Sequence, residues 1–304
     1  MENIKNIISS SDNDKLKEAF LEELKDPDFK ELVSYINCDT KKLYKYRSSI
    51  KDSSVEYKNC KTCKSLKNCK NSLTGYLYFP EYKDDELLFS YVPCKYKKED
   101  IKKNAYLDNI ELFESTTMVK TAKMKDIFVD DKSRIEVIKA VNSFYENYFK
   151  EPKKGIYLSG NFGSGKTYII AALFNELAKK GVKSSIVYFP EFLRVLKASF
   201  AKEDYLDKFE YIKKTPLLLI DDIGAEQVTS WGRDEILGTI LQYRMEENLP
   251  TFFTSNFNIK ELEEHLSSTK EKIEKLKARR IIERINYLCD EMFLIGVDRR
   301  KQKW

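Results

Sequence analysis

Hydrophobic positions divide the chain into two parts with different periods. In residues 1–50, apolar side chains recur every three or four positions, the spacing of amphipathic helices, with Pro27 at the break between the first two. Two apolar runs at 73–79 and 87–92 then predict strands. From residue 155 onward, short apolar runs alternate with helical patterns. This alternation predicts an α/β fold, a mostly parallel sheet with helices on both faces, preceded by a small helical domain.

The predicted strands of the second part cover 155–159, 184–189, 217–221, 251–255 and 292–296, and its predicted helices cover 166–180, 190–201, 231–247 and part of 268–288. Between the two parts, Lys, Glu and Asp dominate residues 96–104, and a polar stretch runs from 115 to 125. We therefore place an N-terminal domain at residues 1–105, a linker at 106–125 and the α/β domain at 126–304.

A complete phosphate-loop pattern, G-x-x-x-x-G-K-[ST], follows the apolar run 156–158 and consists of Gly160, Asn161, Phe162, Gly163, Ser164, Gly165, Lys166 and Thr167. Its glycines let backbone N–H groups turn toward a β-phosphate, its lysine places a charge beside the β- and γ-phosphates, and its threonine hydroxyl ligates Mg²⁺. The helix that continues through Tyr168 directs its positive N-terminal end at the same anion. The loop predicts a nucleoside triphosphate site with Mg²⁺; a chance glycine-rich turn is the plain alternative.

Two further strand ends carry polar side chains. The apolar run 217–220 is typical of a central parallel strand and ends in Asp221 and Asp222. We assign Asp221 to the Mg²⁺ and its water shell, and Asp222 to polarising the water that attacks the γ-phosphate. Asn256 follows the next strand and lies beside the γ-phosphate if that strand lies between the other two. The plain alternatives are an acidic pair that only caps a strand and a Ser-Asn turn signal.

Four of the six cysteines are spaced like metal ligands and not like a disulfide framework. Cys60 and Cys63 form a Cys-x-x-Cys pair, and Cys69 and Cys94 follow. Thiolates suit the tetrahedral coordination of Zn²⁺, so we predict a structural four-sulfur zinc site in the N-terminal domain. Cys38 is an alternative for one ligand, and buried free thiols are the alternative to any metal site. The lysines around these thiols also allow a DNA-contacting face, at Lys58, Lys61, Lys64, Lys67 and Lys70.

Composition and charge limit the choice of partners. The 304 residues carry 54 Lys and Arg against 49 Asp and Glu, a formal net charge of +5, which favours contact with nucleic acid without requiring it. No apolar run approaches the roughly 20 residues that span a bilayer, and the charged N-terminus is unlike a signal segment. We therefore expect a cytoplasmic protein with no membrane contact.

The segment 278–285 has a helical pattern in which Arg280 and Arg284 are four residues apart and share one face. An arginine that reaches a neighbouring subunit's γ-phosphate stabilises the charge of the transition state. A surface stripe paired with nearby acids explains the same pattern. Periodicity alone does not choose between the two.

Four segments together resemble the AAA+ ATPases of the DnaC/DnaI type, the bacterial replicative helicase loaders: GNFGSGKT, LLLIDDIGAE, FFTSN and ARRIIERI. The resemblance extends through residues 126–304, and the cysteines ahead of it are similar to the zinc-containing, helicase-binding domain of the DnaI branch. It implies an AAA+ P-loop fold that binds ATP and Mg²⁺, with Asn256 as the first sensor. It also implies Arg284 as the arginine that acts in trans, and Arg280 as its helper or its replacement.

The same resemblance implies an ATP-dependent loader whose N-terminal domain binds a hexameric replicative DNA helicase. Its ATPase domain self-associates in the ATP state and guides single-stranded DNA into the helicase during initiation or restart of replication. The helix after the strand 184–189 is expected to line the DNA path, with Arg194 and Lys197 at the phosphates. Arg299 or Arg300 is expected to act as a residual second sensor.

Most AAA+ proteins carry Asp-Glu where this chain has Asp221-Asp222, whose second side chain is shorter. We therefore expect ATP hydrolysis that is slow or stimulated by a partner. Two rival functions remain. One is a transposition-associated AAA+ ATPase, against which the cysteine-bearing domain argues, and the other is a nucleotide-switched adaptor with little hydrolysis.

Overall fold

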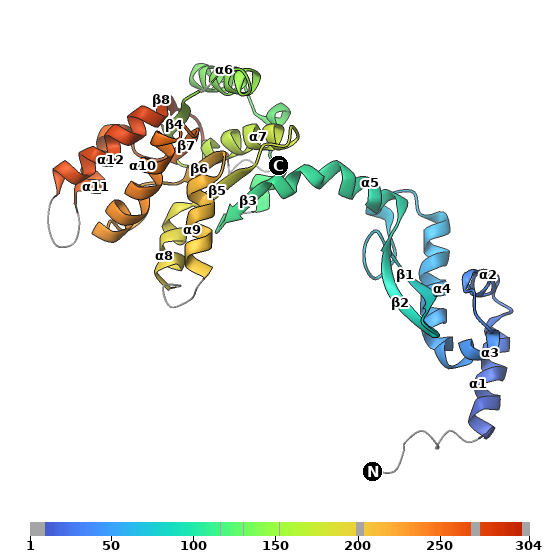
Figure 1. Ribbon diagram of the computed structural model, residues 1–304. Coiled ribbons are helices and arrows are strands. Elements are labelled where there is room, and N and C mark those ends of the chain that lie inside the picture. The colour runs from blue at the N-terminus through green and yellow to red at the C-terminus, as the bar shows by residue number, and fades with distance from the viewer. Residues whose placement is uncertain are drawn as a thin grey trace, which may run out of the picture. The chain divides into compact units, whose positions relative to one another are not determined.

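The computed structural model describes residues 10–115, 117–129, 131–151, 153–198, 204–268 and 274–299. The chain divides into two compact units, Met1–Ala105 and Tyr106–Trp304, here called the N-terminal unit and the C-terminal unit (Figure 1). Each unit has its own hydrophobic core.

The N-terminal unit consists of helices and one β-hairpin. Its elements are α1 (Ser10–Glu23), α2 (Pro27–Tyr35), α3 (Thr40–Leu43), η2 (Tyr44–Tyr46), α4 (Arg47–Thr62), η3 (Leu66–Asn68), β1 (Tyr76–Lys83), β2 (Glu86–Pro93) and α5 (Lys95–Asn104), where η2 and η3 are 3₁₀ turns. Helix α2 begins at Pro27 because the carboxylate of Asp26 accepts the N–H groups of the first turn. The hairpin turn places Asp84 and Asp85 at positive φ, as a two-residue type I′ turn requires.

Helix α4 covers the outer edge of β1 through polar side chains. The buried carboxylate of Glu56 accepts hydrogen bonds from the backbone N–H groups of Ser72 (3.1 Å) and Tyr78 (2.8 Å). The hydroxyl of Ser53 donates to the carbonyl of Tyr78 at 2.5 Å. These bonds satisfy backbone groups that a two-stranded sheet would otherwise leave unpaired. The hairpin is thereby fixed to the helix that carries Cys60.

The C-terminal unit alternates strands and helices. Its strands are β3 (Ile110–Phe113), β4 (Gly155–Gly160), β5 (Ser184–Tyr188), β6 (Leu217–Asp221), β7 (Thr251–Ser255) and β8 (Cys289–Leu294). Its helices are α6 (Lys132–Asn147), α7 (Lys166–Ala178), α8 (Phe189–Ala198), α9 (Asp204–Lys214), α10 (Gly238–Glu246), α11 (Ile259–Ser267) and α12 (Lys275–Leu288), with the π-helix η7 (Trp231–Leu237) before α10. Three 3₁₀ helices, η4 (Ala105–Asn109), η5 (Thr117–Thr121) and η6 (Met124–Asp126), lie around β3 and ahead of α6.

The six strands form one parallel sheet in the order β3-β5-β6-β7-β4-β8. Successive side chains of a strand point to opposite faces, so Tyr157 joins one core while Ile156 and Leu158 join the other. Helices α6 and α7 pack on the face of Ile156, and α8 to α12 pack on the face of Tyr157 (Figure 1). The predicted α/β fold with helices on both faces is confirmed.

The predicted linker at 106–125 is wrong, because this segment belongs to the C-terminal unit. Strand β3 pairs with β5 along the edge of the sheet. The side-chain amide of Asn175 on α7 donates to the carbonyls of Val119 (3.0 Å) and Ala122 (2.7 Å). Ile110, Val119 and Ala122 are buried in the core beneath α7. In sequence, this segment resembles a polar connector because its apolar residues are spaced among lysines. These few apolar residues are enough to anchor it, because the sheet supplies the rest of the core.

The predicted helix 231–247 is present but not uniform. Its first seven residues form the π-helix η7, and only Gly238–Glu246 is α-helical. The ends of two other predicted helices, at 199–201 and 269–273, lie outside the described residues.

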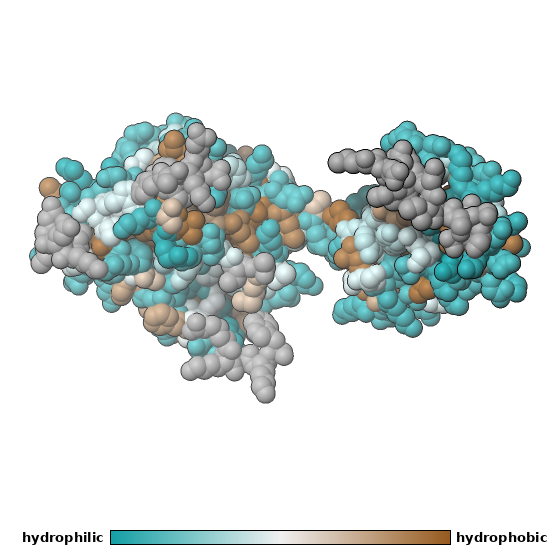
Figure 2. Space-filling view, turned by 90° about the horizontal axis from the view of Figure 1, so that it is seen from below, coloured by the Kyte–Doolittle hydropathy of each residue, from teal (hydrophilic) through white to brown (hydrophobic). Residues whose placement is uncertain are grey.

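The outer surface of both units is largely hydrophilic on the face drawn in Figure 2, where hydrophobic residues form scattered patches. Within the described ranges, no helix has both the length and the apolar content needed to cross a membrane.

Candidate nucleotide site

The strand order brings three of the predicted site segments together. Strand β7 lies between β6, which ends in Asp221, and β4, which leads into the phosphate loop. Because all strands are parallel, their carboxyl ends share one edge of the sheet, where ligands of open α/β sheets bind. The strand before Asn256 thus lies between the other two, which is the condition for Asn256 to lie beside the phosphate loop and the acidic pair.

The phosphate loop turns sharply between β4 and α7. Gly160, Gly163 and Gly165 have φ values of +143°, +69° and +90°, a region that side chains with a Cβ disfavour. A Cβ at Gly160 would also lie 2.0 Å from the carbonyl oxygen of Leu294 in β8. Gly165 is the N-cap of α7, so the loop ends at the positive end of that helix. The positive φ values thus favour glycine at all three positions, and at Gly160 the close approach of β8 also excludes a side chain.

Lys166 is buried and lies inside the curve of the loop. Its Nζ donates hydrogen bonds to the carbonyls of Gly160 (2.8 Å) and Asn161 (2.9 Å) and to Oδ1 of Asn256 (2.9 Å). The ammonium group therefore lies between the loop and the end of β7. This is the position from which a lysine can contact the terminal phosphates of a nucleotide.

Thr167 and Asp221 form the oxygen-rich part of the site. The hydroxyl of Thr167 donates to Oδ1 of Asp221 at 2.6 Å, and the hydroxyl of Thr254 donates to the same oxygen at 2.6 Å. Burial raises the pKa of Asp221, and the two hydroxyl bonds act in the opposite direction. A threonine hydroxyl and a carboxylate are hard oxygen ligands, so this pair fits Mg²⁺ by chemistry and by proximity.

Asp222 has a backbone conformation unusual for a non-glycine residue, with φ at +56°. Its N–H donates to the hydroxyl of Thr254 at 2.9 Å, and its Oδ1 accepts from the side-chain amide of Asn256 at 3.1 Å. Burial raises the pKa of the Asp222 carboxyl, while the charge of Lys166 lowers it. Lys166, Asn256 and Asp222 therefore form one hydrogen-bonded chain across three strand ends.

These groups line a cavity of about 320 Å³. Met118, Ile127, Phe128 and Tyr168 give it an apolar wall, and the exposed ring of Phe162 lies at its rim. Arg299 also lines it, with its N–H donating to the carbonyl of Gly163 at 3.0 Å and its guanidinium 4.5 Å from the centre of the Phe128 ring. An apolar wall beside a cluster of polar groups is the usual composition of a small-molecule site. Arg300 lies outside the described residues.

Two residues of the site, Thr254 and Arg134, are not predicted from the sequence. Thr254 bonds both aspartates, and its place directly before Ser-Asn at a strand end was an available signal. Arg134 on α6 is buried at 2% exposure, lines the cavity and donates to the carbonyl of Ser164. Arg134 lies in a helical pattern outside every recognised motif, so the sequence gives no signal that it lines the nucleotide cavity.

Arg280 and Arg284 do not line this cavity. They line a separate surface hollow of about 540 Å³ together with Arg279, Met245, Leu276 and Tyr287. Arg280 is exposed, while Arg284 is half-buried and donates from Nη1 to the carbonyl of Gly238 at 2.9 Å. The two arginines share a face as the four-residue spacing predicts.

Helix α8 presents Arg194 and Lys197 to solvent and buries Phe189, Phe192 and Leu196. Arg194 is ion-paired with Glu191 on the preceding turn. The aromatic side chains of this helix pack in the core, and its two cations lie on the opposite, exposed side.

Cys60, Cys63, Cys69 and Cys94 come together at one place in the N-terminal unit. They line a cavity of about 170 Å³ at the ends of α4, η3 and β2. Two N–H groups point at sulfur: the amide of Asn71 toward Cys60 and the backbone of Gly75 toward Cys69, each at 3.3 Å. The donor set therefore suits Zn²⁺ chemically.

The predicted zinc site is nevertheless not assembled in this structure. Among the residues described, no group of three or more Cys, His, Asp or Glu side chains is arranged to hold a metal ion. Cys38 does not line the cavity of the four cysteines, and its thiol lies 3.5 Å from the carbonyl of Asp39.

Comparisons with known proteins agree with this geometry. Residues 115–303 match the sequence model of the IstB-like ATP-binding proteins. The replicative helicase loader DnaI of Bacillus subtilis (strain 168) is 40% identical over 268 residues, 86% of this chain and 85% of that protein. A crystal structure of DnaI is 45% identical with a TM-score of 0.58, covering 64% of this chain and 99% of that chain. A primosome component from Streptococcus pyogenes serotype M3, described as putative, is 38% identical with a TM-score of 0.57, covering 66% and 100%.

These likenesses include the phosphate loop, the acidic strand and the parallel sheet, and the match to DnaI extends over both units. The chain therefore belongs to the IstB-like ATP-binding proteins and, within them, to the family of the replicative helicase loader DnaI.

Proposed function

We propose that the chain is an ATP-dependent loader of a hexameric replicative DNA helicase onto single-stranded DNA, during initiation or restart of replication. The observation that carries this proposal is the 40% identity with DnaI over 86% of the chain. A shared ATPase fold alone would support only nucleotide binding. The likeness continues into the N-terminal unit, which is the part expected to bind the helicase.

The nucleotide site supports ATP hydrolysis as the reaction. Lys166 is placed to contact the terminal phosphates, and Thr167 and Asp221 to ligate Mg²⁺. The metal ion supplies charge neutralisation of the phosphates. Asp222 and Asn256, joined by a hydrogen bond, are placed to orient the attacking water. The shorter side chain of Asp222, relative to the glutamate of most AAA+ proteins, supports slow hydrolysis that a partner stimulates.

The position of the arginines supports self-association in the ATP state. Arg284, with Arg280 as its helper or replacement, lines a hollow that is separate from the chain's own nucleotide cavity. The hollow combines three arginines with Met245, Leu276, Glu283 and Tyr287. Of these residue types, Arg, Met and Tyr are enriched at protein interfaces. We propose that this face abuts the nucleotide cavity of a second copy, so that each shared site takes its arginine from the neighbour.

Co-purification with the host's replicative helicase tests the proposed partner, and phosphate release tests the reaction. We expect the full chain to retain the helicase and to hydrolyse ATP faster with helicase and single-stranded DNA than alone. Asp222→Asn should bind ATP and lose the stimulated hydrolysis. If wild type and Asp222→Asn release phosphate equally slowly with both partners present, the chain is a nucleotide-switched adaptor and not an ATPase.

We propose that Cys60, Cys63, Cys69 and Cys94 close around one structural Zn²⁺. The support is that all four thiols face one small cavity from the ends of separate elements. A metal ion there would join α4, η3 and the end of β2 in a unit whose core is small.

Zinc content tests this site. The purified full chain should contain about one zinc ion, and Cys63→Ser should lose it, because three thiolates hold the ion less tightly than four. Cys38→Ser is the matched control and should keep the zinc, since Cys38 lies outside the cavity. A folded, zinc-free wild-type chain, measured by mass spectrometry of the metal, would contradict the proposal.

We further propose that single-stranded DNA contacts the exposed side of α8 through Arg194 and Lys197. Replacing both by alanine should weaken DNA binding and lower the slope of log K against log salt by about 1.4, at roughly 0.7 per lost phosphate contact. The matched control is Lys179→Ala with Lys260→Ala, two exposed lysines, one at the C-cap of α7 and one on α11. Fluorescence anisotropy with a labelled oligonucleotide measures the DNA affinity of both variants at several salt concentrations. An unchanged slope in the α8 variant would contradict this assignment.

A DNA-contacting role for the lysines beside the cysteines has less support. Lys61 is ion-paired with Asp28 (2.7 Å) and Glu31 (2.6 Å), and Lys58 lies 3.6 Å from Asp28. These acids offset part of the basic face that the spacing suggested.

A further inference from the structure

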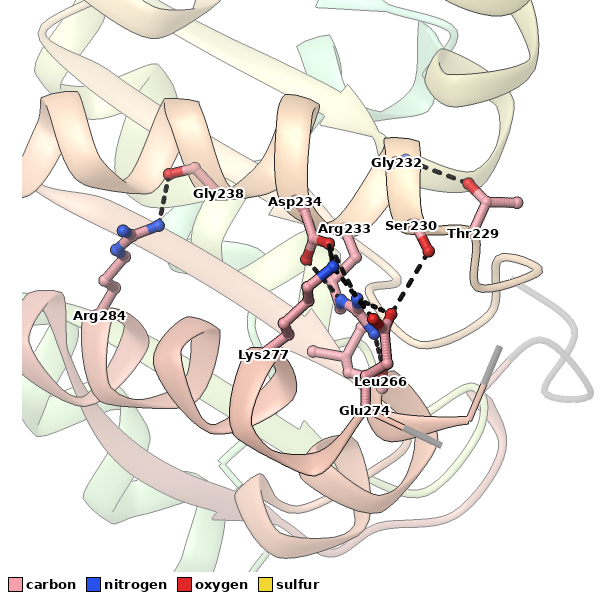
Figure 3. A network of polar contacts seen from close by, with 10 residues as sticks. All are labelled: Thr229, Ser230, Gly232, Arg233, Asp234, Gly238, Leu266, Glu274, Lys277 and Arg284. Carbon is pink, nitrogen blue, oxygen red and sulfur yellow. Dashed lines mark hydrogen bonds and ion pairs between the residues drawn. The ribbon is translucent and has the colours of Figure 1, made fainter. Parts of the chain in front are cut away.

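A network of charged side chains joins the π-helix η7 to helix α12, which carries Arg280 and Arg284 (Figure 3). At its centre is Arg233 of η7, which donates to Asp234 from Nε (2.6 Å) and Nη2 (2.9 Å) and to Glu274 from Nη2 (2.6 Å). Its Nη1 donates to the carbonyl of Leu266, at the end of α11, at 3.0 Å. One guanidinium thus contacts η7, α11 and the residue that precedes α12.

The network is built around a buried charge. Arg233 is 2% exposed, and its partner Glu274 is the N-cap residue directly before α12. Lys277, on the first turn of α12, lies 3.1 Å from Asp234 and 3.0 Å from Glu274. Fork-shaped guanidinium bonds fix orientation as well as distance, which a flexible lysine on the surface cannot do. The N-terminal end of α12 is therefore held in register with η7 by Arg233.

Beyond η7, the chain contacts α12 a second time at Gly238, the first residue of α10. Arg284 donates from Nη1 to the carbonyl of Gly238, the residue that follows η7 (Figure 3). A Cβ at Gly238 would lie 3.3 Å from that nitrogen, so the approach is close. The placement of Arg284 therefore depends on the register between η7 and α12.

The segment that faces the N-terminal end of α12 is a π-helix and not an α-helix. Such helices are rare and are frequently found at functional sites. The wider turn shifts the residues that follow it relative to an α-helix. Here the π-helix ends at Leu237, and the next residue, Gly238, accepts the hydrogen bond from Arg284. Segment 222–230 connects η7 to the acidic strand, and Ile223 at its start is bonded through its N–H to the carbonyl of Thr254 at 3.0 Å.

We infer that Arg233 is a positioning residue that aligns the arginine face of α12 with the nucleotide of the neighbouring subunit. The inference rests on the proposed role of Arg284 in trans. Arg233 lines neither the nucleotide cavity nor the hollow of the arginines, so it acts only through the placement of α12. Arg233 therefore connects two parts of the chain. One is the segment that follows the acidic strand β6, and the other is helix α12, whose arginines are proposed to complete the nucleotide site of the neighbouring subunit.

Mixed-subunit hydrolysis tests the inference in the full chain with helicase and single-stranded DNA. Arg233→Lys keeps a charge and loses the fork, so phosphate release should fall roughly ten- to a hundredfold, the order of loss that misplacing a catalytic group by about 1 Å produces. ATP affinity should not change. Adding Lys166→Ala subunits, whose own site is inactive and whose arginines are intact, should restore hydrolysis, because they supply a well-placed arginine to the variant's nucleotide.

A second variant covers the case in which Arg233→Lys does not fold. Glu274→Gln keeps the shape of the side chain at the start of α12 and removes the charge that Arg233 contacts, and it should show the same loss and the same rescue. Asn286→Ala is the matched control on α12, because Asn286 is exposed and lines neither the nucleotide cavity nor the hollow of the arginines. It should hydrolyse ATP like the wild type.

Arg284→Ala, mixed with Lys166→Ala subunits in the same assay, separates the positioning role of Arg233 from the proposed trans role of Arg284. Loss and rescue in Arg284→Ala together with Arg233→Lys or Glu274→Gln support the inference. Loss and rescue in Arg284→Ala alone overturn the inference and leave the proposed function standing. Normal hydrolysis by Arg284→Ala overturns the inference, and normal hydrolysis by Arg280→Ala as well overturns the trans arginine of the proposed function.

Discussion

Lys166→Ala should lose about 3 kcal/mol of binding free energy for Mg²⁺-ATP, roughly a hundredfold in Kd. Lys166 is buried between the phosphate loop and Asn256, and its Nζ is the charged donor at the centre of three hydrogen bonds. A nucleotide whose terminal phosphates enter this position would meet alanine in place of a cation. The charge-assisted bonds to phosphate would be lost, and no water could replace them at equal strength.

Calorimetric titration with a non-hydrolysable ATP analogue measures this effect. Lys179→Ala is the matched control, since Lys179 lies at the other end of α7 and is paired with Glu176 on the surface. A Kd for Lys166→Ala within threefold of the wild-type value would show that the cavity between β4 and β6 is not the nucleotide site.

Arg244→Met should lower the free energy of unfolding by about 4 kcal/mol, because buried and partly buried oxygens lose their donor at about 1–3 kcal/mol each. Arg244 is 0% exposed. It donates to the hydroxyl of Thr251 at 2.8 Å and to the carbonyls of Thr215 and Pro250, each at 2.7 Å. Burial lowers the pKa of Arg244 to about 9, so the charge is costly and depends on these bonds.

The side chain of Arg244 joins the segments that precede β6 and β7, the two strands that carry the acidic pair and Asn256. Its loss should therefore affect the whole C-terminal unit. Urea unfolding followed by circular dichroism measures the change, with Arg279→Met as the exposed control, expected to stay within about 0.5 kcal/mol of wild type. A loss below 1 kcal/mol in Arg244→Met would show that water or a rearranged backbone satisfies these carbonyls.

The motifs of the nucleotide site could be located from sequence because each is local. The glycines and Lys166 follow a fixed spacing, and the run of apolar residues before Asp221 requires a strand buried on both faces. Asn256 could be placed only by assuming the strand order, which is set by packing between distant segments. The order β6-β7-β4 makes that assumption correct.

The buried arginines could not be predicted in the same way. Arg134, Arg233 and Arg244 look like surface residues in a helical pattern, and each is buried because carbonyl or carboxylate groups far along the chain surround it. The π-helix was hidden for a related reason. Ile236, Leu237, Ile240 and Leu241 have the spacing of an ordinary α-helix, and the wider turn arises where Arg233 is held by Glu274.

The 106–125 segment shows the limit of composition as a guide to domain boundaries. Its lysines and threonines suggest a connector, whereas a few apolar residues among them are enough to extend an existing sheet. An edge strand needs only one neighbour, so its sequence carries a weaker pattern than a central strand. The cysteines show the converse, since their spacing predicts a shared site and the structure brings them to one cavity without a ligating arrangement.

Transfer of the host's hexameric replicative helicase onto a single-stranded DNA circle tests the central claim most directly. The account predicts that the full chain with Mg²⁺-ATP increases the amount of helicase recovered on the DNA. Lys166→Ala, with an unchanged N-terminal unit, should bind the helicase and fail to transfer it. Transfer that is equal with wild type, with Lys166→Ala and without the chain would contradict the account.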